Sequence, residues 1–463
     1  MKINRRVILF CAAMLLGTGV TLPAASQATG RYVPPKDRVV VVISIDGLPG
    51  WEWQDPRLPV PNLWKLVHNG VRASIATTTN PTMTWPSHTS MVTGVPPARH
   101  GLLYNGLPVR GEARAPVVIK PWIPKEELVQ APTVYDLAYN AGFTTAEVDW
   151  VAIHQAKTIT WRFPEVPDPA GAIEREMAAA GILSESDARE FSKFSPVARD
   201  RYWTDAAVHI LKRHKPNLLL FHLLNVDSSN HTYGPRTNAS KTAYAYADEC
   251  VAKIVDALKT AGLSDRATIL VVSDHGFKTA KRLVKPNSSL RRLGLLSVNN
   301  EKIAGDVYAT SSGGSAMLYI MNAARKAELT PKLAEAFRTV EGVDRVLLPE
   351  DFDQWGLPNP AANSRMGDLY LLAKDGYAFN ARPDGPELSG VEGAYPGNHG
   401  YSASDPDMAI TFIASGYGIC KGAALERMSS MDVGPTIAAL LGLEMKNVEG
   451  RVLKEILVSN QVK

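Results

Sequence analysis

Six aspartate and histidine side chains are spaced so that a folded chain could collect them as metal ligands. They are Asp46, Asp227, His231, Asp274, His275 and His399. Asp227 and His231 are separated by one helical turn, a spacing that lets both side chains reach one ion. Asp274 and His275 are adjacent, so we expect their side chains to point in different directions and to serve neighbouring ions. Three carboxylates with three imidazoles suit zinc, with manganese or iron as alternatives.

The remaining histidines carry less information. Four of them have no acidic or histidine neighbour at ligand spacing, and we interpret them as structural residues. These four are His68, His209, His214 and His222.

Hydroxyl-bearing residues crowd ahead of a helix that we expect at residues 87–93. A hydroxyl at a helix start lies beside free backbone N–H groups and the positive end of the helix dipole, which suits a phosphate group. The alternative is that Ser87 only caps the helix. Because a threonine hydroxyl is a poor nucleophile unless a base or a metal lowers its pKa, an ion held by Asp46, Asp274 and His275 would activate it. Two ions about 4 Å apart can clamp the attacking and leaving oxygens of an in-line displacement.

Three apolar runs position the three aspartates. These runs, each followed by an aspartate, cover residues 39–45, 217–226 and 267–273. Continuous apolar character predicts strands that are buried on both faces. Helical patterns lie between the runs, at residues 62–69, 204–213 and 244–261. The alternation predicts an α/β fold, a three-layer sandwich with a central, mostly parallel sheet covered by helices, in which ligands bind at the carboxyl ends of the strands.

The amino-acid composition excludes several classes of protein. The chain has 463 residues, of which 45% are hydrophobic and 21% charged. This composition can bury a large core, and it excludes a disordered polymer, a collagen-like fibre and a coiled coil. The formal charge of +4 reflects 50 basic and 46 acidic side chains, and three of the basic ones precede an apolar run at residues 7–20.

That N-terminal pattern predicts a secretory signal peptide over residues 1–28, cleaved after Ser26 or Ala28. The alternative is an uncleaved N-terminal anchor. Removing three of the 50 basic side chains leaves 47 against 46 acidic ones, a charge of +1 that gives no general attraction to nucleic acid or membranes. We therefore expect a periplasmic or secreted protein with a small-molecule phosphoester substrate, no specific nucleic-acid partner and no stable membrane anchor. The sequence leaves the oligomeric state open, and also whether Cys250 and Cys420 form a disulfide or remain separate thiols.

The middle of the chain has a different residue pattern. Pro- and Asn-rich segments that interrupt regular structure lie on either side of a helical pattern at residues 326–340. We expect residues 277–390 to form an inserted cap subdomain. The core α/β catalytic domain would then comprise residues 29–276 and 391–463, the second part containing a strand at 408–414 and a helix at 433–441.

Several sequence blocks occur in one order between residues 39 and 443. They read Ile45-Asp46-Gly47, Pro81-Thr82-Met83-Thr84-Trp85-Pro86-Ser87-His88, His100-Gly101, Asp227-Ser-Ser-Asn-His231, Ser273-Asp274-His275-Gly276 and Asn398-His399-Gly400-Tyr401. Together they resemble the alkaline phosphatase superfamily and, within it, the nucleotide pyrophosphatase/phosphodiesterase branch. The resemblance implies an alkaline phosphatase-like fold and the activity of a phosphoric ester hydrolase.

The resemblance also implies roles for individual residues. Thr84 aligns with a nucleophile that forms a phosphothreonine intermediate and contacts the first of two zinc ions. The first zinc would be held by Asp46, Asp274 and His275, and the second, which stabilises the leaving oxygen and later activates water, by Asp227, His231 and His399. Asn105 aligns with an amide that donates to a phosphoryl oxygen, although an ordinary Asn-Gly turn explains it as well.

The sequence favours a diester over a monoester substrate. A dianionic monoester favours a basic residue near its oxygens, and the resemblance implies that the related monoesterases carry a basic pair in the stretch that corresponds to residues 147–153. That stretch contains Glu147 and Asp149 instead. Trp150 offers an apolar surface for a second ester substituent, and Trp85 stands where the branch often has phenylalanine. Both tryptophans either bind substrate or only pack.

Three alternatives remain. The same site could hydrolyse phosphomonoesters or phosphonates, it could transfer the phosphoryl group to an alcohol, or it could belong to a non-catalytic metal-binding protein. The presence of all six ligands together with Thr84 argues against the last of these.

Overall fold

The structure is a computed structural model that describes residues 31–300, 302–391 and 395–459. The predicted signal peptide at residues 1–28 lies outside the described residues. Among the described helices, none combines the length and the apolar character that crossing a bilayer would require.

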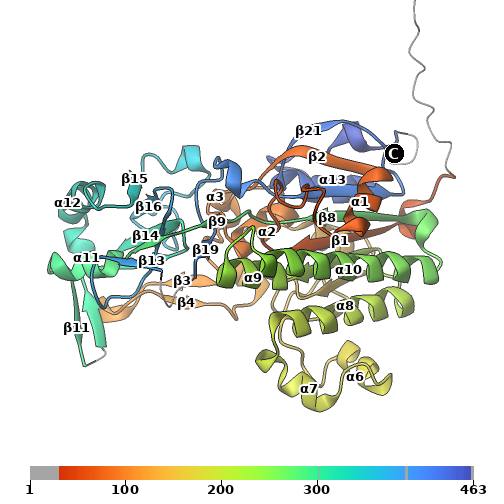
Figure 1. Cartoon of the computed structure of the whole chain (residues 1–463), viewed down its shortest axis with the longest axis horizontal. Coiled ribbons are helices and arrows are strands. Elements are labelled where there is room, and N and C mark those ends of the chain that lie inside the picture. Colours follow the sequence, from red (N-terminus) through yellow and green to blue (C-terminus); the bar gives the residue numbers. More distant parts are fainter. Residues whose placement is uncertain (1–30, 301, 392–394, 460–463) are drawn as a thin grey trace, which may run out of the picture. The chain divides into compact units, whose positions relative to one another are not determined.

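A sheet of eight strands forms the centre of the α/β fold (Figure 1). In spatial order the strands are β21 (Leu425–Ser429), β2 (Gly70–Thr77), β20 (Phe412–Gly416), β8 (Ala267–Val272), β1 (Val39–Ile45), β7 (Leu218–Leu223), β5 (Thr145–Val148) and β6 (Trp161–Phe163). Every pairing in the sheet is parallel except those that β20 makes with β2 and β8. The prediction of a mostly parallel sheet is confirmed.

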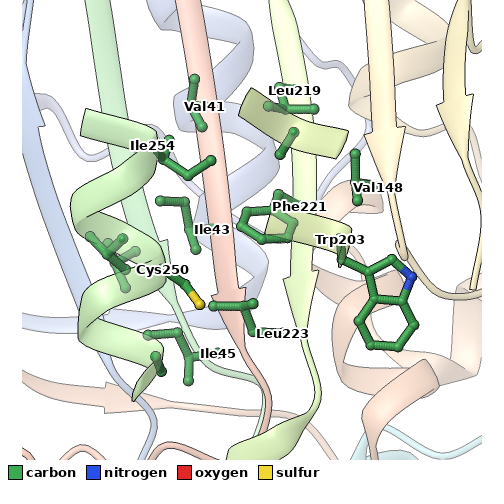
Figure 2. Packing of buried hydrophobic residues seen from close by; sticks show 14 of the residues in the cluster. Val41, Ile43, Ile45, Val148, Trp203, Leu219, Phe221, Leu223, Cys250 and Ile254 are labelled. Carbon is green, nitrogen blue, oxygen red and sulfur yellow. The ribbon is translucent and has the colours of Figure 1, made fainter. Parts of the chain in front are cut away.

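The two faces of the sheet are buried against different helices. Figure 2 shows one face, where Val41, Ile43 and Ile45 of β1 pack with Phe221 and with residues of the helix that carries Cys250. The alternate residues Val40 and Val42 point into the core on the other face. Because the central strands are buried on both faces, their sequences are continuously apolar.

Helices cover both faces, which makes the fold a three-layer sandwich. The layer on the Ile43 face contains α1 (Pro61–His68), α6 (Ala172–Ala179), α7 (Glu185–Arg189), α8 (Pro196–Arg213), α9 (Asn225–Tyr233) and α10 (Asn238–Thr260). The opposite layer contains α2 (Thr84–Thr93), α5 (Val134–Asn140) and α13 (Val433–Leu440). Shorter elements are α3 (Pro97–His100), α4 (Lys125–Leu128) and the hairpin of β3 (Leu107–Val109) and β4 (Val118–Lys120).

Residues between β8 and β20 build further sheets with a hydrophobic core of their own. An antiparallel sheet has the order β13 (Val307–Ser311), β14 (Ser315–Ile320), β16 (Leu369–Ala373), β15 (Val343–Leu347). A second has the order β17 (Tyr377–Phe379), β10 (Arg282–Val284), β18 (Leu388–Gly390), and β11 (Leu296–Asn299) pairs with β12 (Lys302–Gly305). The helices here are α11 (Pro286–Arg292) and α12 (Lys326–Arg338). The domain boundaries predicted from the sequence stay a prediction.

Some element boundaries differ from those expected. The second of the three apolar runs, 217–226, contains strand β7, which ends at Leu223, and the start of α9 at Asn225. The helix expected at 87–93 already begins at Thr84 because Pro86 falls in its first turn, where the missing N–H costs no hydrogen bond. Both Cys250 and Cys420 are free thiols, which answers the question that the sequence left open.

Candidate metal centre and active site

The three strand-end aspartates meet at one edge of the sheet. Strand β1 lies between β7 and β8 and runs parallel to both, so the carboxyl ends of all three strands lie side by side. The backbone N–H of Asp46 still donates to Leu223 of β7 at 3.0 Å. Asp227 lies in the first turn of α9, and His231 follows one turn later.

Asp46, Asp274 and His275 form the first ligand group, and all three are buried. His275 Nε2 lies 3.1 Å from Asp274 Oδ2 and 3.4 Å from Asp46 Oδ1. Adjacency alone suggested that Asp274 and His275 could serve neighbouring ions, whereas the structure brings their donor atoms together with that of Asp46 into one group. The backbone bends at Asp274 immediately after β8, so the alternation of side chains along a strand no longer applies to these two residues.

Asp227, His231 and His399 form the second group. His231 Nε2 lies 3.4 Å from Asp227 Oδ1. The two-residue strands β9 (Lys278–Thr279) and β19 (Gly397–Asn398) pair antiparallel, which brings the segment of His399 beside that of His275. The rings of His275 and His399 stack with centroids 3.8 Å apart, so the two ligand groups adjoin each other.

The unused polar atoms of these groups fit divalent cations. His231 Nδ1 is 2.9 Å from the Gly397 carbonyl and His399 Nδ1 is 2.8 Å from that of Thr82, contacts in which each Nδ1–H donates. Nε2 of each ring is then left as a ligand, and the backbone contact fixes the tautomer. Four ligand atoms are buried without a hydrogen-bond partner: Asp46 Oδ1, Asp227 Oδ1, Asp274 Oδ2 and His275 Nε2. Buried polar atoms are rarely left unpaired, and bound metal ions would satisfy all four.

The electrostatics of the site favour the same conclusion. Burial, followed by the charge of Asp46, raises the pKa of the Asp227 and Asp274 carboxyls well above its usual value. Burial also lowers the pKa of His275 to about 4 and that of His399 well below its usual value, so both imidazoles are neutral. Neutral imidazoles and crowded carboxylates are the form in which these groups bind metal ions, and the ions supply the missing positive charge.

His222, which the sequence led us to interpret as structural, contacts a ligand of the first group. Its Nε2 lies 3.1 Å from Asp46 Oδ2, and its Nδ1 lies 2.8 Å from Asp149 Oδ2. All three side chains are buried, and Asp149 adopts a left-handed backbone conformation with φ of 55°. Despite burial, the two carboxylates raise the pKa of the His222 imidazole well above its usual value. A histidine inside an otherwise apolar buried strand requires hydrogen-bond partners. This feature of the sequence could have indicated that His222 contacts other polar side chains.

Two other histidines contact an acidic side chain that the sequence did not indicate. His209 and His214 both contact Glu176 of α6, at 2.8 and 2.9 Å. His68 has a ring contact with Trp64.

The start of α2 is tied to both ligand groups. Thr84 is its first residue and is mostly buried. The carbonyl of Thr82 accepts hydrogen bonds from His399 Nδ1 and from the Gly400 N–H, and Thr78 Oγ1 donates to the carbonyl of Asp274 at 2.6 Å. These contacts place the helix start beside the ligands. Ser87 lies inside the helix with its Oγ 3.0 Å from Thr78 Oγ1, and the N-cap residue is Met83, so Ser87 does not cap the N-terminus.

Asn105 lies beside this helix start. Its Oδ1 accepts the backbone N–H of Trp85 at 3.0 Å, which leaves the Nδ2 amide group free to donate. Asn105 also lines a cavity of about 1010 Å³ together with Met83, His231 and His399. We call this the metal-side cavity. It contains Lys285 and Arg382, and among the described residues neither forms an ion pair and no acidic side chain lines the cavity.

Trp85 and Trp150 line a different cavity, of about 540 Å³, which we call the tryptophan cavity. Both side chains are largely buried, at 9% and 4% exposure, so only part of each ring faces the cavity. The lining also includes Trp122 and three carboxylates, those of Glu147, Glu165 and Asp168. Met83 borders the metal-side cavity and Trp85 the tryptophan cavity, so the two chain neighbours of Thr84 line different cavities.

Comparison with known proteins identifies a matching family. Residues 40–402 match the family described as type I phosphodiesterase / nucleotide pyrophosphatase. The chain is 22% identical over 448 residues to rat ectonucleotide pyrophosphatase/phosphodiesterase family member 7, covering 93% of this chain and 90% of that protein. It is 23% identical over 433 residues to human ectonucleotide pyrophosphatase/phosphodiesterase family member 5. That match covers 91% of this chain and 78% of the human protein.

Solved structures show the same fold. The structure of human ectonucleotide pyrophosphatase/phosphodiesterase 5 superimposes with a TM-score of 0.68 at 20% sequence identity, covering 91% of this chain and 99% of that one. An inactive variant of the mouse protein, solved in complex with AMP, superimposes with a TM-score of 0.68 at 19% sequence identity. The match covers 92% of this chain and 100% of the mouse chain.

Proposed function

The chain belongs to the type I phosphodiesterase / nucleotide pyrophosphatase family, whose members are phosphoric ester hydrolases, and we propose that it cleaves phosphodiesters with Thr84 as the nucleophile. The proposed metal ligands are Asp46, Asp274 and His275 for one ion, and Asp227, His231 and His399 for the other. The donor set suits zinc.

The observation that supports the choice of a diester is that Met83 and Trp85, the two chain neighbours of Thr84, line different cavities. A diester has a substituent on each side of the phosphorus, and a monoester has only one. The metal-side cavity would receive the leaving group, because it borders the second ligand group. The tryptophan cavity would receive the substituent that stays on phosphorus, with aromatic faces for an aryl group or a base. The AMP bound by the mouse relative is a monoester, and it supports a nucleoside as the substituent that stays on phosphorus.

In the proposed reaction Thr84 Oγ1 attacks phosphorus and gives a phosphothreonine intermediate, while the leaving group departs toward the metal-side cavity. When bound, the two divalent ions would lower the pKa of the attacking hydroxyl and offset negative charge on the leaving oxygen. Asn105 would donate its Nδ2 amide to a phosphoryl oxygen, an interaction that grows stronger as charge develops. The first turn of α2 adds backbone N–H groups directed at the anion.

We assign a positioning role to His222. Its hydrogen bond to Asp46 Oδ2 leaves Oδ1 of the same carboxylate for the ion, and Asp149 holds the ring from the other side. This is the arrangement by which partners behind a ligand fix its orientation.

The proposed activity is tested by comparing an aryl phosphodiester, an aryl monophosphate, an aryl phosphonate and an aryl sulfate on one enzyme sample, with its metal content measured by elemental analysis. We expect the diester to give the highest kcat/KM, with zinc present at two or more equivalents per chain. Equal or faster monoester hydrolysis would refute the diester choice. Product transfer to an added alcohol would favour a phosphoryl transferase instead.

We further propose that the protein is exported, on the basis of the N-terminal sequence pattern at residues 1–28. Mass spectrometry of the protein recovered from the periplasm or medium should show an N-terminus at Gln27 or Thr29, the residues that follow the two expected cleavage positions. A protein that retains Met1 in a cytosolic fraction would contradict export.

A further inference from the structure

A third cluster of metal-ligating side chains lies outside the proposed active site. Within the described residues, three groups of His and acidic side chains have donor atoms that converge within 4.8 Å. Two are the ligand groups described above, and the third comprises Glu176, His209 and His214. This third group joins α6 to the C-terminal end of α8, in the helical layer below the sheet in Figure 1.

The two histidines converge on a single oxygen. Nε2 of His209 lies 2.8 Å from Glu176 Oε2, and Nε2 of His214 lies 2.9 Å from the same atom. Oε1 of Glu176 has no partner within the described part of the chain. His209 is in the last turns of α8, whereas His214 is its C-cap, where the changed backbone turns the second ring toward the first. The His214 ring stacks on Trp161, with centroids 3.7 Å apart, which fixes its plane.

Metal binding requires the tautomers of both rings to change, and the ion would then replace the hydrogen bonds that the two Nε2 atoms make to Glu176 Oε2. Neither Nδ1 of His209 nor Nδ1 of His214 has a hydrogen-bond partner within the described residues, so each can carry the ring proton while Nε2 keeps its lone pair. Both histidines are mostly buried, at 13% and 11% side-chain exposure. Of the three cluster residues, His209 lines an open depression of about 690 Å³, from which an ion could enter.

Arg213 is the one group among the described residues that competes for the same position. Its Nε lies 3.1 Å from Glu176 Oε2, and its side chain is 65% exposed. Since the arginine extends into solvent, it can move to the unused Oε1 while an ion takes the place of the two N–H donors at Oε2. The negative charge of Glu176 then remains shared between the ion and the guanidinium.

We propose that Glu176, His209 and His214 form a third metal site, which binds a divalent ion of the zinc, nickel or copper type. Two imidazole nitrogens and one carboxylate oxygen are a ligand set for such ions, with water completing the coordination. Bound metal would join α6 to α8 and so hold the segment 164–194 against the helical layer. The site does not depend on the proposed phosphodiesterase function.

The test uses zinc and the whole chain. Wild type, His209→Ala, His214→Ala and a control, His68→Ala, are equilibrated with buffered free zinc, and the bound zinc per chain is counted by elemental analysis. His68 likewise lies at the C-terminal end of a helix, but it belongs to no ligand cluster among the described residues. We expect the two cluster variants to hold one equivalent less than wild type and the control to hold the same number.

His209→Gln separates metal loss from misfolding. Its side-chain amide can still donate to Glu176, but it lacks an imidazole lone pair, so we expect it to lose the third equivalent while keeping phosphodiesterase activity. The proposal is overturned if the cluster variants retain the wild-type zinc count, or if the His68→Ala control loses as much zinc as they do. It is also overturned if wild type binds only as much zinc as His209→Gln.

Discussion

His222 Nε2 lies 3.1 Å from Asp46 Oδ2, and this contact links a strand-end aspartate to a histidine that is itself held by Asp149. The three groups form a chain of hydrogen bonds that runs through the interior behind the first ligand group. Asp46 thereby presents one oxygen to the proposed metal and the other to a fixed donor.

His222→Ala should weaken the site without removing a ligand. We expect metal affinity and kcat/KM to fall by about 10- to 100-fold, as found when partners behind a ligand are removed. His222→Gln retains an N–H that can reach Asp46, so it should recover part of the loss. Zinc affinity measured by competition with a chelator, together with kcat and KM, checks this. A wild-type zinc affinity in His222→Ala would show that the residue only packs.

Thr84→Ala removes the proposed nucleophile but leaves all six proposed ligands in place. Turnover should fall by at least about 1,000-fold, since no other hydroxyl replaces the attacking group. Thr84→Ser should retain measurable activity because it keeps a hydroxyl at the start of α2. The zinc content of Thr84→Ala should match wild type, and substantial turnover in this variant would assign the nucleophile elsewhere.

Metal removal should affect both activity and stability. Three buried carboxylates converge at the strand ends, and without cations their mutual repulsion is uncompensated. A chelator should therefore abolish turnover and lower the midpoint of thermal unfolding, and zinc should restore both. At a free zinc concentration 100 times its Kd, each site contributes about 2.7 kcal/mol to the free energy of unfolding. An unchanged midpoint in the metal-free protein would contradict this linkage.

The charges of the metal-side cavity should select its occupant. Arg382 and Lys285 line this cavity without an ion pair in the described parts of the chain, so a leaving group with negative charge gains attraction there. Arg382→Ala should lower kcat/KM about fivefold for a diester whose leaving group carries a phosphate. This decrease corresponds to the loss of about 1 kcal/mol of attraction between the guanidinium and the phosphate. A neutral aryl leaving group should be almost unaffected. Arg338→Ala, an exposed arginine outside the cavity, serves as the control, and equal losses in both variants would argue against a cavity effect.

The sequence predicted that three aspartates would meet at one edge of the sheet. It did not predict the hydrogen bonds that hold these aspartates from the protein interior. Asp46, Asp227 and Asp274 follow apolar runs, and the fixed geometry of parallel strands then brings them to one edge. His222 is different, because its partners lie 73 and 176 residues away and no local pattern joins them. The convergence of Asp274 and His275 depends on a bend that starts where the strand stops. The pairing of His209 and His214 with Glu176 requires the packing of α6 on α8, which periodicity does not specify.

Two glycines provide a matched test of how the loop at His399 is held. Gly400 and Gly422 both have positive φ, 86° and 74°, so alanine at either position carries a conformational cost of about 1–2 kcal/mol. A Cβ at Gly422 would meet nothing within 4 Å, whereas a Cβ at Gly400 would lie 1.7 Å from the carbonyl oxygen of Ser312. Gly422→Ala should therefore only lower the free energy of unfolding, with activity unchanged.

Gly400→Ala should do more, because the clash must displace backbone next to His399. The Gly400 N–H donates to the carbonyl of Thr82 at 3.1 Å, so the displacement also reaches the segment that leads to Thr84. We expect a larger loss of stability than in Gly422→Ala, about one zinc equivalent fewer, and a clear decrease in kcat. Chemical denaturation, elemental analysis and kinetics on the two variants measure these effects. If Gly400→Ala behaves like Gly422→Ala in all three, close contact between this loop and Ser312 is not what positions His399.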